Sequence, residues 1–380
     1  MKEKKTILLL SPIPPPLGGI ASWTKHILQY YNNEEKNINF SIIHLSTSNK
    51  KRRVTDKRQI FRILTGIVNT LQVIIDFYLK IKKDKPDIVH FSSSASFGLF
   101  RDCLIQYIIK SNKVANIIHF HFGRIPILAE KKNWEWYLLK KIISNSTQAI
   151  VIDQKSYTTL HLLGFSNINY IPNPIAPEIL DIKKITRKEL NINESKNIVF
   201  VGHVIPAKGV FELVKACIEI PNLFLELIGP VEDSIKEDLF LIASQRDNGE
   251  WLKIPGGKNT EYVIEKMIST NIFCLPSYTE GFPNVILESM ACGCPIISTN
   301  VGAIPQMLNT IDLNNQCGIC IEPKDSKAIK NTIEYYINNP EVAKLHGNNA
   351  RKRVLTEYNM PTIWKMLEDI WFKANYRNNQ

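Results

Sequence analysis

Two carboxylates with seven residues between them, Glu280 and Glu288, lie in the stretch SYTEGFPNVILESMACGCP, residues 277–295. Gly281 follows the first carboxylate and lets the backbone approach a ligand closely. Pro283 fits the first turn of a helix, where its missing N–H costs little. The pattern predicts that Glu280 lies in a loop before a helix. Glu288 is then expected inside that helix, about one turn from its start.

This arrangement predicts a particular ligand. The first amides of a helix attract phosphate, and a carboxylate on either side can hold hydroxyl groups. A diphosphate flanked by two polyols is a nucleotide sugar, with ribose on one side and hexose on the other. The alternative is that Glu280 is only a charge favoured at a helix start and Glu288 only a solvated residue.

A second element in the same half could bind phosphate. The stretch VFVGHVIPAKGVFELVKA, residues 199–216, has the pattern of a strand, a turn and a helix. Lys208 precedes Gly209 and is expected at the helix N-terminus, at the carboxyl edge of the strand. A full positive charge beside a helix N-terminus suits a phosphate. Taken alone, a lysine before a helix is more often a solvated surface charge.

The segments around these residues alternate between apolar runs and helical patterns. This predicts parallel sheets covered on both faces. The expected strands are 5–11, 38–46, 87–93, 116–123, 148–154, 197–203, 223–229, 251–257, 271–277, 295–300 and 317–323. The expected helices are 20–31, 57–85, 210–219, one after Val231, 261–269 and 284–291.

A break in this pattern divides the chain. Prolines and an asparagine in YIPNPIAPEI, residues 170–179, predict a linker. We expect two doubly wound α/β domains, with ligands at the carboxyl ends of the strands. The predicted domains are 1–172, for the acceptor, and 173–360, for the nucleotide sugar. A C-terminal helix at about 361–380 is expected to pack back on the first domain.

The charge of the 380-residue chain is uneven. Residues 1–172 carry 25 Lys/Arg and 11 Asp/Glu, a net charge of +14, whereas residues 173–380 carry 22 and 25, a net charge of −3. The segments 49–64 and 130–142 combine basic residues with apolar ones, and the second also contains tryptophan. This is typical of contact with an anionic membrane surface, although an ordinary solvated helix face fits too. No recognition motif accompanies the basic residues, so no nucleic acid is expected as a partner.

Other classes are disfavoured by composition. No run of 18 apolar residues predicts a membrane-spanning helix, and the apolar run near the start is interpreted as the first strand of a cytosolic protein. Seven scattered cysteines include one Cys-x-x-Cys, at Cys317 and Cys320, without a second pair to complete a zinc site. We therefore expect reduced thiols, no metal and no cofactor.

The Glu-x7-Glu stretch, extended to residues 276–308, strongly resembles the retaining glycosyltransferases of family 4, which have the GT-B fold. The resemblance covers almost the whole chain and includes segments that match the family in order. These are PPPLGGIASWTKHI (14–27), KPDIVHFSS (85–93), IIHFHFG (117–123), the segment 149–175 and FVGHVIPAKG (200–209). The ordered set is specific, whereas single pieces other than the Glu-x7-Glu region are not.

The resemblance implies roles for residues of the second half. Glu280 is expected to contact the transferred sugar and Glu288 the ribose of the nucleotide. Lys208 matches the lysine that steadies the diphosphate. The backbone N–H groups after the first glutamate are expected to bind the donor, and they belong to Gly281, Phe282 and Asn284.

The resemblance also implies roles for residues of the first half. Gly18 and Gly19 match a loop that approaches the donor phosphate and the acceptor. His121 matches a histidine near the transferred sugar, and His119 is the less favoured register.

Three positions depart from the family: Pro174 stands in place of a glycine, Asp153 stands where a serine is common, and His203 changes a charge. His203 stands where the family has an arginine, which is always charged, whereas histidine is half-charged near neutral pH. Arg124 is one candidate to supply the missing cation.

The implied reaction is metal-independent hexosyl transfer (EC 2.4) from a nucleoside diphosphate sugar to an acceptor hydroxyl, with retention. The absence of Asp-x-Asp from the sequence fits this expectation. The expected acceptor is a glycan linked to lipid diphosphate, in the assembly of a bacterial surface polysaccharide such as O-antigen or capsule. The enzyme is expected in the cytoplasm, peripheral on the inner face of the membrane. The alternatives are an epimerase or phosphorylase of soluble sugars with the same fold, or a catalytically weak assembly partner.

Overall fold

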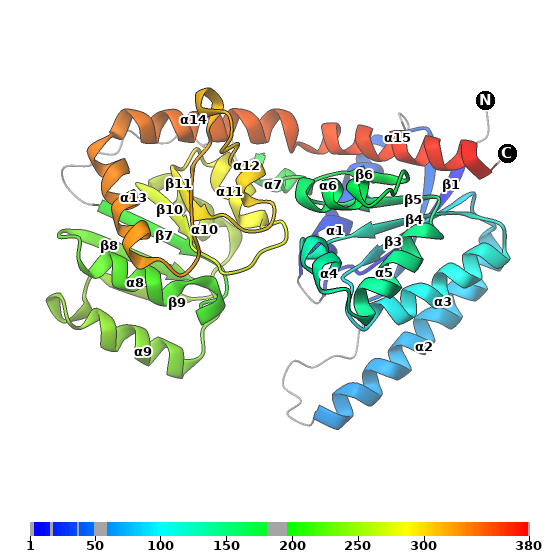
Figure 1. Cartoon of the computed structure of the whole chain (residues 1–380), viewed down its shortest axis with the longest axis horizontal. Coiled ribbons are helices and arrows are strands. Elements are labelled where there is room, and N and C mark those ends of the chain that lie inside the picture. The colour runs from blue at the N-terminus through cyan, green and yellow to red at the C-terminus, as the bar shows by residue number, and fades with distance from the viewer. Residues whose placement is uncertain (1–3, 16–17, 36–37, 49–58, 181–195, 379–380) are drawn as a thin grey trace. The chain divides into compact units, whose positions relative to one another are not determined.

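A computed structural model of the chain describes residues 4–15, 18–35, 38–48, 59–180 and 196–378, without the side chains of 59–65 and 376–378. The chain forms two units, shown in Figure 1. The first contains Met1–Asn173 and Met360–Gln380, and the second contains Pro174–Asn359. Each unit has a six-stranded parallel sheet with helices packed against it. Both units have the doubly wound α/β architecture that the sequence predicts.

The sheet of the first unit has the strand order β2-β1-β3-β4-β5-β6. Its strands are β1 Lys5–Ser11, β2 Phe40–Ser46, β3 Ile88–Ser93, β4 Ala115–Phe120, β5 Gln148–Val151 and β6 Ile168–Tyr170. β3, β4 and β5 are buried along their whole length. This burial explains why the central strands read as nearly continuous apolar runs.

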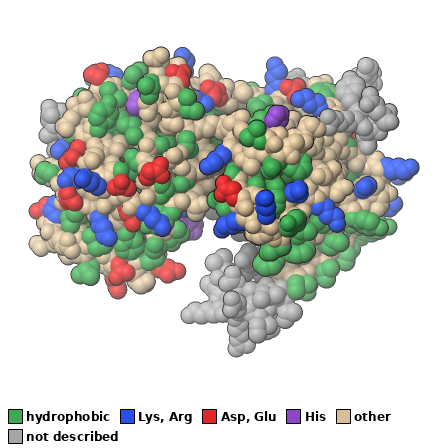
Figure 2. Space-filling view, viewed as in Figure 1, with side chains coloured by type: hydrophobic (Ala, Val, Ile, Leu, Met, Phe, Trp, Pro, Cys, Tyr) green, Lys and Arg blue, Asp and Glu red, His purple; other side chains and the backbone are tan. Residues whose placement is uncertain are grey.

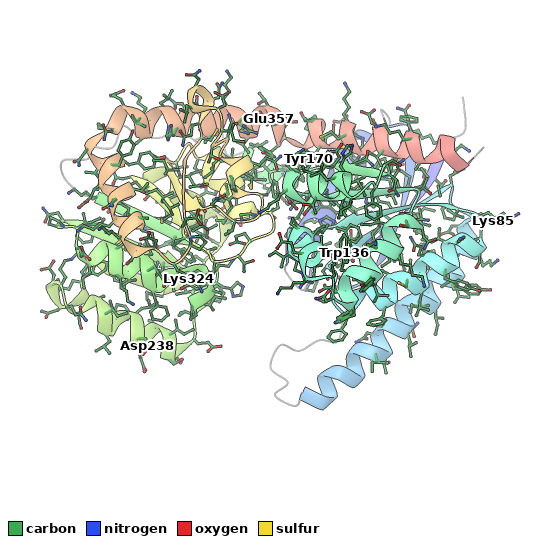
Figure 3. The ribbon with its side chains drawn as sticks, viewed as in Figure 1. Lys85, Trp136, Tyr170, Asp238, Lys324 and Glu357 are labelled. Atoms are coloured by element: carbon green, nitrogen blue, oxygen red, sulfur yellow. The ribbon has the colours of Figure 1, made fainter. Side chains whose placement is uncertain are left out.

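The helices of the first unit form two apolar cores with this sheet. They are α1 Gly19–Glu34, α2 Gln59–Asp84, α3 Gly98–Ser111, α4 Ile125–Lys131, α5 Trp134–Ser144, α6 Gln154–Leu162 and α15 Met360–Asn378. The first core cluster includes Phe77 of α2, Leu99 of α3 and Trp136 of α5, which is labelled in Figure 3. The second core cluster includes Trp23 of α1 and Trp371 of α15. The last helix of the chain therefore completes the first unit.

The sheet of the second unit has the strand order β12-β11-β10-β7-β8-β9. Its strands are β7 Lys196–Val201, β8 Leu223–Ile228, β9 Leu252–Gly256, β10 Ile272–Leu275, β11 Ile296–Thr299 and β12 Ile319–Ile321. β7 and β10 are neighbours, and the chain continues from them in opposite directions across the sheet. Such a switch point opens a crevice at the carboxyl ends of the two strands, where α/β proteins bind ligands.

The second unit contains eight described helices. They are α7 Pro177–Leu180, α8 Val210–Ile218, α9 Asp233–Ala243, α10 Thr260–Ser269, α11 Asn284–Ala291, α12 Ile304–Met307, α13 Ser326–Asn338 and α14 Pro340–Glu357. Short 3₁₀ helices lie at Pro206–Lys208 (η2), Asp247–Gly249 (η3) and Leu313–Asn315 (η4). The helix expected at 284–291 is observed with those bounds, and that expected at 210–219 ends one residue earlier.

Some expected elements differ from the observed ones. The strand expected at 116–123 ends at Phe120, although the His121 amide still donates to the Ser93 carbonyl. The linker expected at 170–179 includes the end of β6 and the start of α7. The basic segment 49–64 lies outside the residues whose side chains are described. Among the described helices, none combines the length and the apolar character needed to cross a bilayer.

Three histidines lie together beside the second core cluster. His90 and His119 belong to β3 and β4, and His121 follows β4. The His119 and His121 rings stack with centroids 4.0 Å apart, and Trp371 Nε1 donates to His90 Nδ1 over 3.1 Å. Burial lowers the pKa of His90 and that of His121 to about 3, and it lowers the pKa of His119 well below its usual value. The folded protein therefore holds these rings neutral.

This neutral cluster makes the stability of the first unit sensitive to acid. Between the unfolded pKa of about 6.5 and the lowered folded values, the unfolded chain binds protons that the folded chain does not. The free energy of unfolding should therefore fall as the pH drops through this window. Each histidine should contribute a slope of about 1.4 kcal/mol per pH unit.

We expect His119→Phe to reduce this slope by about one histidine's share. The measurement is urea unfolding between pH 7 and about pH 4. His161→Phe, at an exposed position on α6, is the matched control and should leave the slope unchanged. An equal slope in wild type and His119→Phe would contradict a neutral buried cluster.

Candidate functional site

Lys208 and Glu280 meet at the switch point of the second sheet. Lys208 ends η2, in the loop after β7, and Glu280 lies in the loop after β10. The Lys208 Nζ to Glu280 Oε1 distance is 2.5 Å, and the Ser277 hydroxyl donates to the same oxygen over 2.7 Å. The exposed fraction is 25% for the lysine side chain and 10% for the glutamate side chain. The two charges are therefore held at the carboxyl edge of β7 and β10 with little solvent around them.

Close backbone packing fixes the loop that carries Glu280. Gly209 has φ +70°, and a Cβ there would lie 2.1 Å from the Pro276 carbonyl oxygen. The Tyr278 amide donates to the Ala207 carbonyl over 2.9 Å. These contacts join the loop after β7 to the loop after β10, so the position of Lys208 depends on that of Glu280.

A third loop, after β11, supports the other side of Glu280. Gly302 has φ +56°, and a Cβ there would lie 2.3 Å from the Glu280 carbonyl oxygen. The Ala303 amide donates to the Gly281 carbonyl over 2.9 Å, and the Thr299 hydroxyl donates to the Ser277 carbonyl over 2.6 Å. Only glycine fits at position 302 without moving the backbone of the glutamate loop.

Tyr278 adds side-chain contacts to this support. Its hydroxyl donates to Glu212 Oε1 over 2.8 Å, and Lys324, labelled in Figure 3, has Nζ 4.9 Å from the ring centroid. Burial, followed by the bond to Glu212, raises the pKa of Tyr278 to about 12. The phenol therefore stays protonated and remains a donor to Glu212.

Helix α11 follows the glutamate loop directly. Pro283 caps it with extended φ/ψ angles, and Asn284 is its first residue. Phe282 is buried, with its ring centroid 6.0 Å from that of Tyr358. Gly281, Phe282 and Asn284, which were expected to present backbone N–H groups, thus lie at the N-terminal end of a helix.

Glu288 lies inside α11, as its spacing predicts. Its side chain is half-buried, and burial raises its pKa to about 7. Among the described residues, no hydrogen bond to its carboxylate is found. A carboxylate in this state gains from a ligand hydroxyl that replaces lost water.

His203, one of the residues that depart from the family pattern, lies on the same edge of the sheet. It follows Gly202 at the end of β7 and is exposed. The Val204 amide donates to the Pro230 carbonyl over 2.9 Å, which ties this loop to the end of β8. The imidazole is accessible from solvent next to the turn that leads to Lys208.

The other expected site residues belong to the first unit. Gly18 caps α1 and Gly19 begins it, and a Cβ at either position would meet no described atom within 4 Å. His121 is half-buried, and its Nε2 lies 3.3 Å from the Ser92 hydroxyl. His119 is fully buried within β4. His121 is therefore the more accessible of the two rings, and its role in the reaction stays a prediction.

Arg124, the candidate replacement cation, is engaged within the first unit. Its NH2 group donates to Glu135 Oε1 over 2.5 Å and to the Ser96 hydroxyl over 2.7 Å. Its guanidinium carbon lies 5.4 Å from the centroid of the Phe122 ring. A phosphate bound by Arg124 would have to compete with the buried carboxylate of Glu135.

The structure brings Lys208 and Glu280 into contact. Glu288 lies on α11, the helix that follows Glu280, and His203 lies just after β7. Sequence reasoning missed the supporting residues Ser277, Tyr278 and Gly302. Ser277 and Tyr278 stand within the quoted stretch, where a hydroxyl and a phenol beside a carboxylate were a usable signal. Gly302 follows the stretch by several residues, and its contact with Glu280 arises only from the fold.

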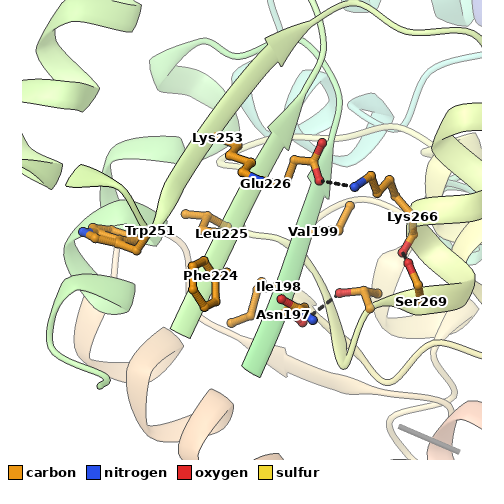
Figure 4. A pocket seen from close by; sticks show the side chains of 11 residues that line it. Asn197, Ile198, Val199, Phe224, Leu225, Glu226, Trp251, Lys253, Lys266 and Ser269 are labelled. Atoms are coloured by element: carbon orange, nitrogen blue, oxygen red, sulfur yellow. Dashed lines mark hydrogen bonds and ion pairs between the residues drawn. The ribbon is translucent and has the colours of Figure 1, made fainter. Parts of the chain in front are cut away.

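A cavity of about 240 Å³ lies elsewhere in the second unit (Figure 4). Asn197, Phe224 and Trp251 line it near the first residues of β7, β8 and β9, away from the carboxyl edge. Glu226 and Lys266 form an ion pair of 3.1 Å at its wall. The cavity is therefore distinct from the loops that hold Lys208 and Glu280.

The close packing around Gly302 predicts that adding a methyl group at this position destabilises the second unit. Gly302→Ala should destabilise the second unit by about 2–4 kcal/mol, from the left-handed φ and the contact with the Glu280 carbonyl together. Gly256→Ala is the matched control, because Gly256 has φ +76° but open space around its Cβ. It should cost only about 1 kcal/mol. Urea unfolding compares the two, and equal costs would show that the close approach to Glu280 is unimportant.

The raised pKa of Glu288 predicts that a neutral side chain at this position increases the free energy of unfolding, by an amount that depends on pH. The folded state favours the protonated carboxyl, so wild-type stability should fall as the pH rises from about 4.5 through about 7. Glu288→Gln should match wild type near pH 4.5 and exceed it by about 2–3 kcal/mol above pH 7. Glu237→Gln, at an exposed position on α9, is the control. A difference that does not change with pH would contradict the raised pKa.

Comparison with known proteins identifies relatives of this chain in sequence and in structure. Residues 181–353 match the family model of glycosyl transferases group 1. The capsular polysaccharide biosynthesis glycosyltransferase CapM of Staphylococcus aureus is 28% identical over 328 residues, which cover 80% of this chain and 82% of CapM.

Solved structures share the fold over nearly the whole chain. HepE of Anabaena, in complex with UDP, has a TM-score of 0.69 at 14% identity and covers 96% of this chain and 98% of its own. The lipopolysaccharide outer core galactosyltransferase WaaB has a TM-score of 0.70 at 16% identity and covers 97% and 99%. The chain therefore has the GT-B fold, and its residues 181–353 match glycosyl transferases group 1.

Proposed function

We propose that this chain is a retaining glycosyltransferase that moves a sugar from a nucleoside diphosphate sugar to an acceptor hydroxyl. The observation that carries the proposal is the contact between Lys208 and Glu280 at the switch point of the second sheet. A cation for a diphosphate and a carboxylate for sugar hydroxyls stand side by side there. The match to glycosyl transferases group 1 covers both residues and supports the proposal.

The leaving diphosphate is the charge that this region is suited to stabilise. Breaking the bond between sugar and phosphate leaves an oxocarbenium-like sugar and adds negative charge to the diphosphate. Lys208 and the amides at the start of α11 are donors that the fold places at this edge of the sheet, so they can stabilise this charge. No step of this account uses a metal ion, so we propose that the reaction is metal-independent.

The two glutamates bind the two polyols of the donor in this proposal. Glu280 accepts hydrogen bonds from hydroxyls of the transferred sugar, and Glu288 accepts them from the ribose. Donor binding then favours the ionised form of Glu288, because that form accepts two hydroxyl groups. A UDP-sugar is the first donor to test, since HepE is described in complex with UDP.

The acceptor is expected to bind the first unit, near His121 and the Gly18–Gly19 turn. We propose a lipid-linked glycan in surface polysaccharide assembly, reached from a peripheral position on the membrane. The names of CapM and WaaB, which belong to capsule and lipopolysaccharide biosynthesis, support this choice. The net charge of +14 on residues 1–172 supports attraction to an anionic lipid surface.

Substitution of Lys208 tests the proposal. Lys208→Met should lower kcat by about 10²–10³, because one preorganised donor to the developing charge is lost. The measurement is transfer of sugar from UDP-, GDP- and ADP-sugars to acceptor lipids extracted from membranes. Lys215→Met, an exposed lysine on α8, is the matched control and should keep wild-type kcat.

Two outcomes would contradict the proposal. The first is a Lys208→Met variant with unchanged kcat. The second is a wild-type protein whose melting temperature no nucleotide sugar raises, since a bound donor must stabilise the fold by mass action. Turnover of free sugar without transfer would instead favour an epimerase or phosphorylase.

A further inference from the structure

The outer face of α2 carries a row of large apolar side chains. Ile67, Leu71, Ile75 and Tyr78 are spaced four, four and three residues apart, so they line one side of the helix. Their exposed fractions lie between 49% and 54%. The opposite side of α2 is also apolar, and its Phe77 is fully buried in the first core cluster. The second apolar side of α2 has no covering element among the described residues.

The row continues across the neighbouring helices. α3 packs between α2 and α5. Phe97 and Phe100, at the start of α3, are 80% and 53% exposed, and each ring centroid lies 5.6 Å from that of Trp134 on α5. Tyr107 of α3 and Tyr137 of α5 are also exposed. Figure 2 shows hydrophobic side chains gathered over this part of the first unit. We call the outer side of α2, α3 and α5 the apolar face.

The segment that contains the apolar face is basic. Residues 66–144 hold 12 Lys/Arg and 6 Asp/Glu, a net charge of +6. Lysines occupy the last turns of all three helices, at Lys82, Lys83, Lys110 and Lys141. The face therefore combines an apolar centre and aromatic residues with lysines at the C-terminal ends of its helices.

We infer that the apolar face inserts into the surface of an anionic lipid bilayer. Amphipathic helices with large apolar residues on one side and lysines at the border bind at the boundary between headgroups and acyl chains. Tryptophan and tyrosine favour that same depth, and each nearby lysine is attracted to acidic lipids. The inference rests on the proposed function only for its purpose, which is to bring the enzyme to a lipid-linked acceptor.

A second copy of the chain is a poorer occupant. A symmetric dimer through the apolar face would bring two surfaces from net-positive segments together. Like charges facing each other across an interface oppose association. An anionic bilayer would both neutralise the lysines at the helix ends and cover the apolar centre.

Trp134 offers a direct test of insertion. The other five tryptophans, Trp23, Trp136, Trp251, Trp364 and Trp371, are at most 5% exposed, whereas Trp134 is 45% exposed. Adding vesicles of phosphatidylcholine and phosphatidylglycerol should shift the emission of the full chain to the blue and protect it from acrylamide. Trp134→Phe should still bind the vesicles but lose the shift. Binding without any shift from Trp134 would overturn insertion at this face.

A triple substitution tests the contribution of α2. Ile67→Gln, Leu71→Gln and Ile75→Gln together should lower vesicle binding at least ~10-fold in flotation at ~0.1 M salt, because apolar burial is lost. The matched control combines Leu162→Gln, Leu241→Gln and Ile311→Gln, which are 71–96% exposed and lie away from the face. The control should float like wild type. Far-UV circular dichroism and melting temperature check that both triple variants are folded.

Two further measurements distinguish a wrong occupant of the apolar face from a wrong proposed function. If light scattering shows a dimer in wild type and a monomer in the α2 triple variant, a second copy of the chain covers the apolar face, and the bilayer inference is wrong. Failure of wild type to float with acidic vesicles would overturn the inference outright. Transfer to a detergent-solubilised acceptor should be equal in wild type and the α2 triple variant. If the wild type transferred no sugar to the solubilised acceptor, only the proposed function would be contradicted. The flotation result would still stand, because vesicle binding does not require sugar transfer.

Discussion

The ion pair between Lys208 and Glu280 joins two loops that are far apart in the sequence. It lies at the edge of the sheet, where solvent reaches 25% of the lysine side chain and 10% of the glutamate side chain. Burying a charge costs free energy unless an opposite charge neutralises it. Here the lysine and the glutamate neutralise each other. In the proposed function, the donor would separate this pair, with its phosphates at the lysine and its sugar hydroxyls at the carboxylate. The close backbone contacts of Gly209 and Gly302 hold the loops that carry the two side chains.

Much of the second unit could be predicted because its local signals agree. Proline at the start of α11 and an apolar run before it set the limits of the element that holds Glu288. Lys208 was expected at the carboxyl edge of β7 because a glycine and a helical pattern follow it. The sequence alone could not show which residues of distant segments come into contact. Nothing local connects Gly302 to Glu280, or Glu212 to Tyr278, since each pair meets only when the strands assemble in order.

The first unit shows the limits of periodicity more clearly. The helical pattern of 57–85 identifies α2, but apolar residues on two sides of a helix do not reveal which side is buried. The run ending in His-Phe-His-Phe-Gly reads as one strand, yet β4 ends at Phe120 and leaves His121 outside the ladder. Arg124 was considered as a phosphate-binding cation on charge alone, and its pairing with Glu135 depends on the fold of α4 against α5. In each case the identity of the element was predictable, and the environment of its side chains was not.

Helix α15 has a consequence for how the chain is made. Trp364, Leu367 and Trp371 belong to the same core cluster as Trp23 and Ile7, although the whole second unit lies between them in the sequence. A ribosome therefore completes the second unit before it releases the helix that closes the first. Until residues 360–378 have emerged, the second core cluster lacks one of its two helices, and only α1 is present. The first unit can therefore complete its core only after the whole second unit has been synthesised.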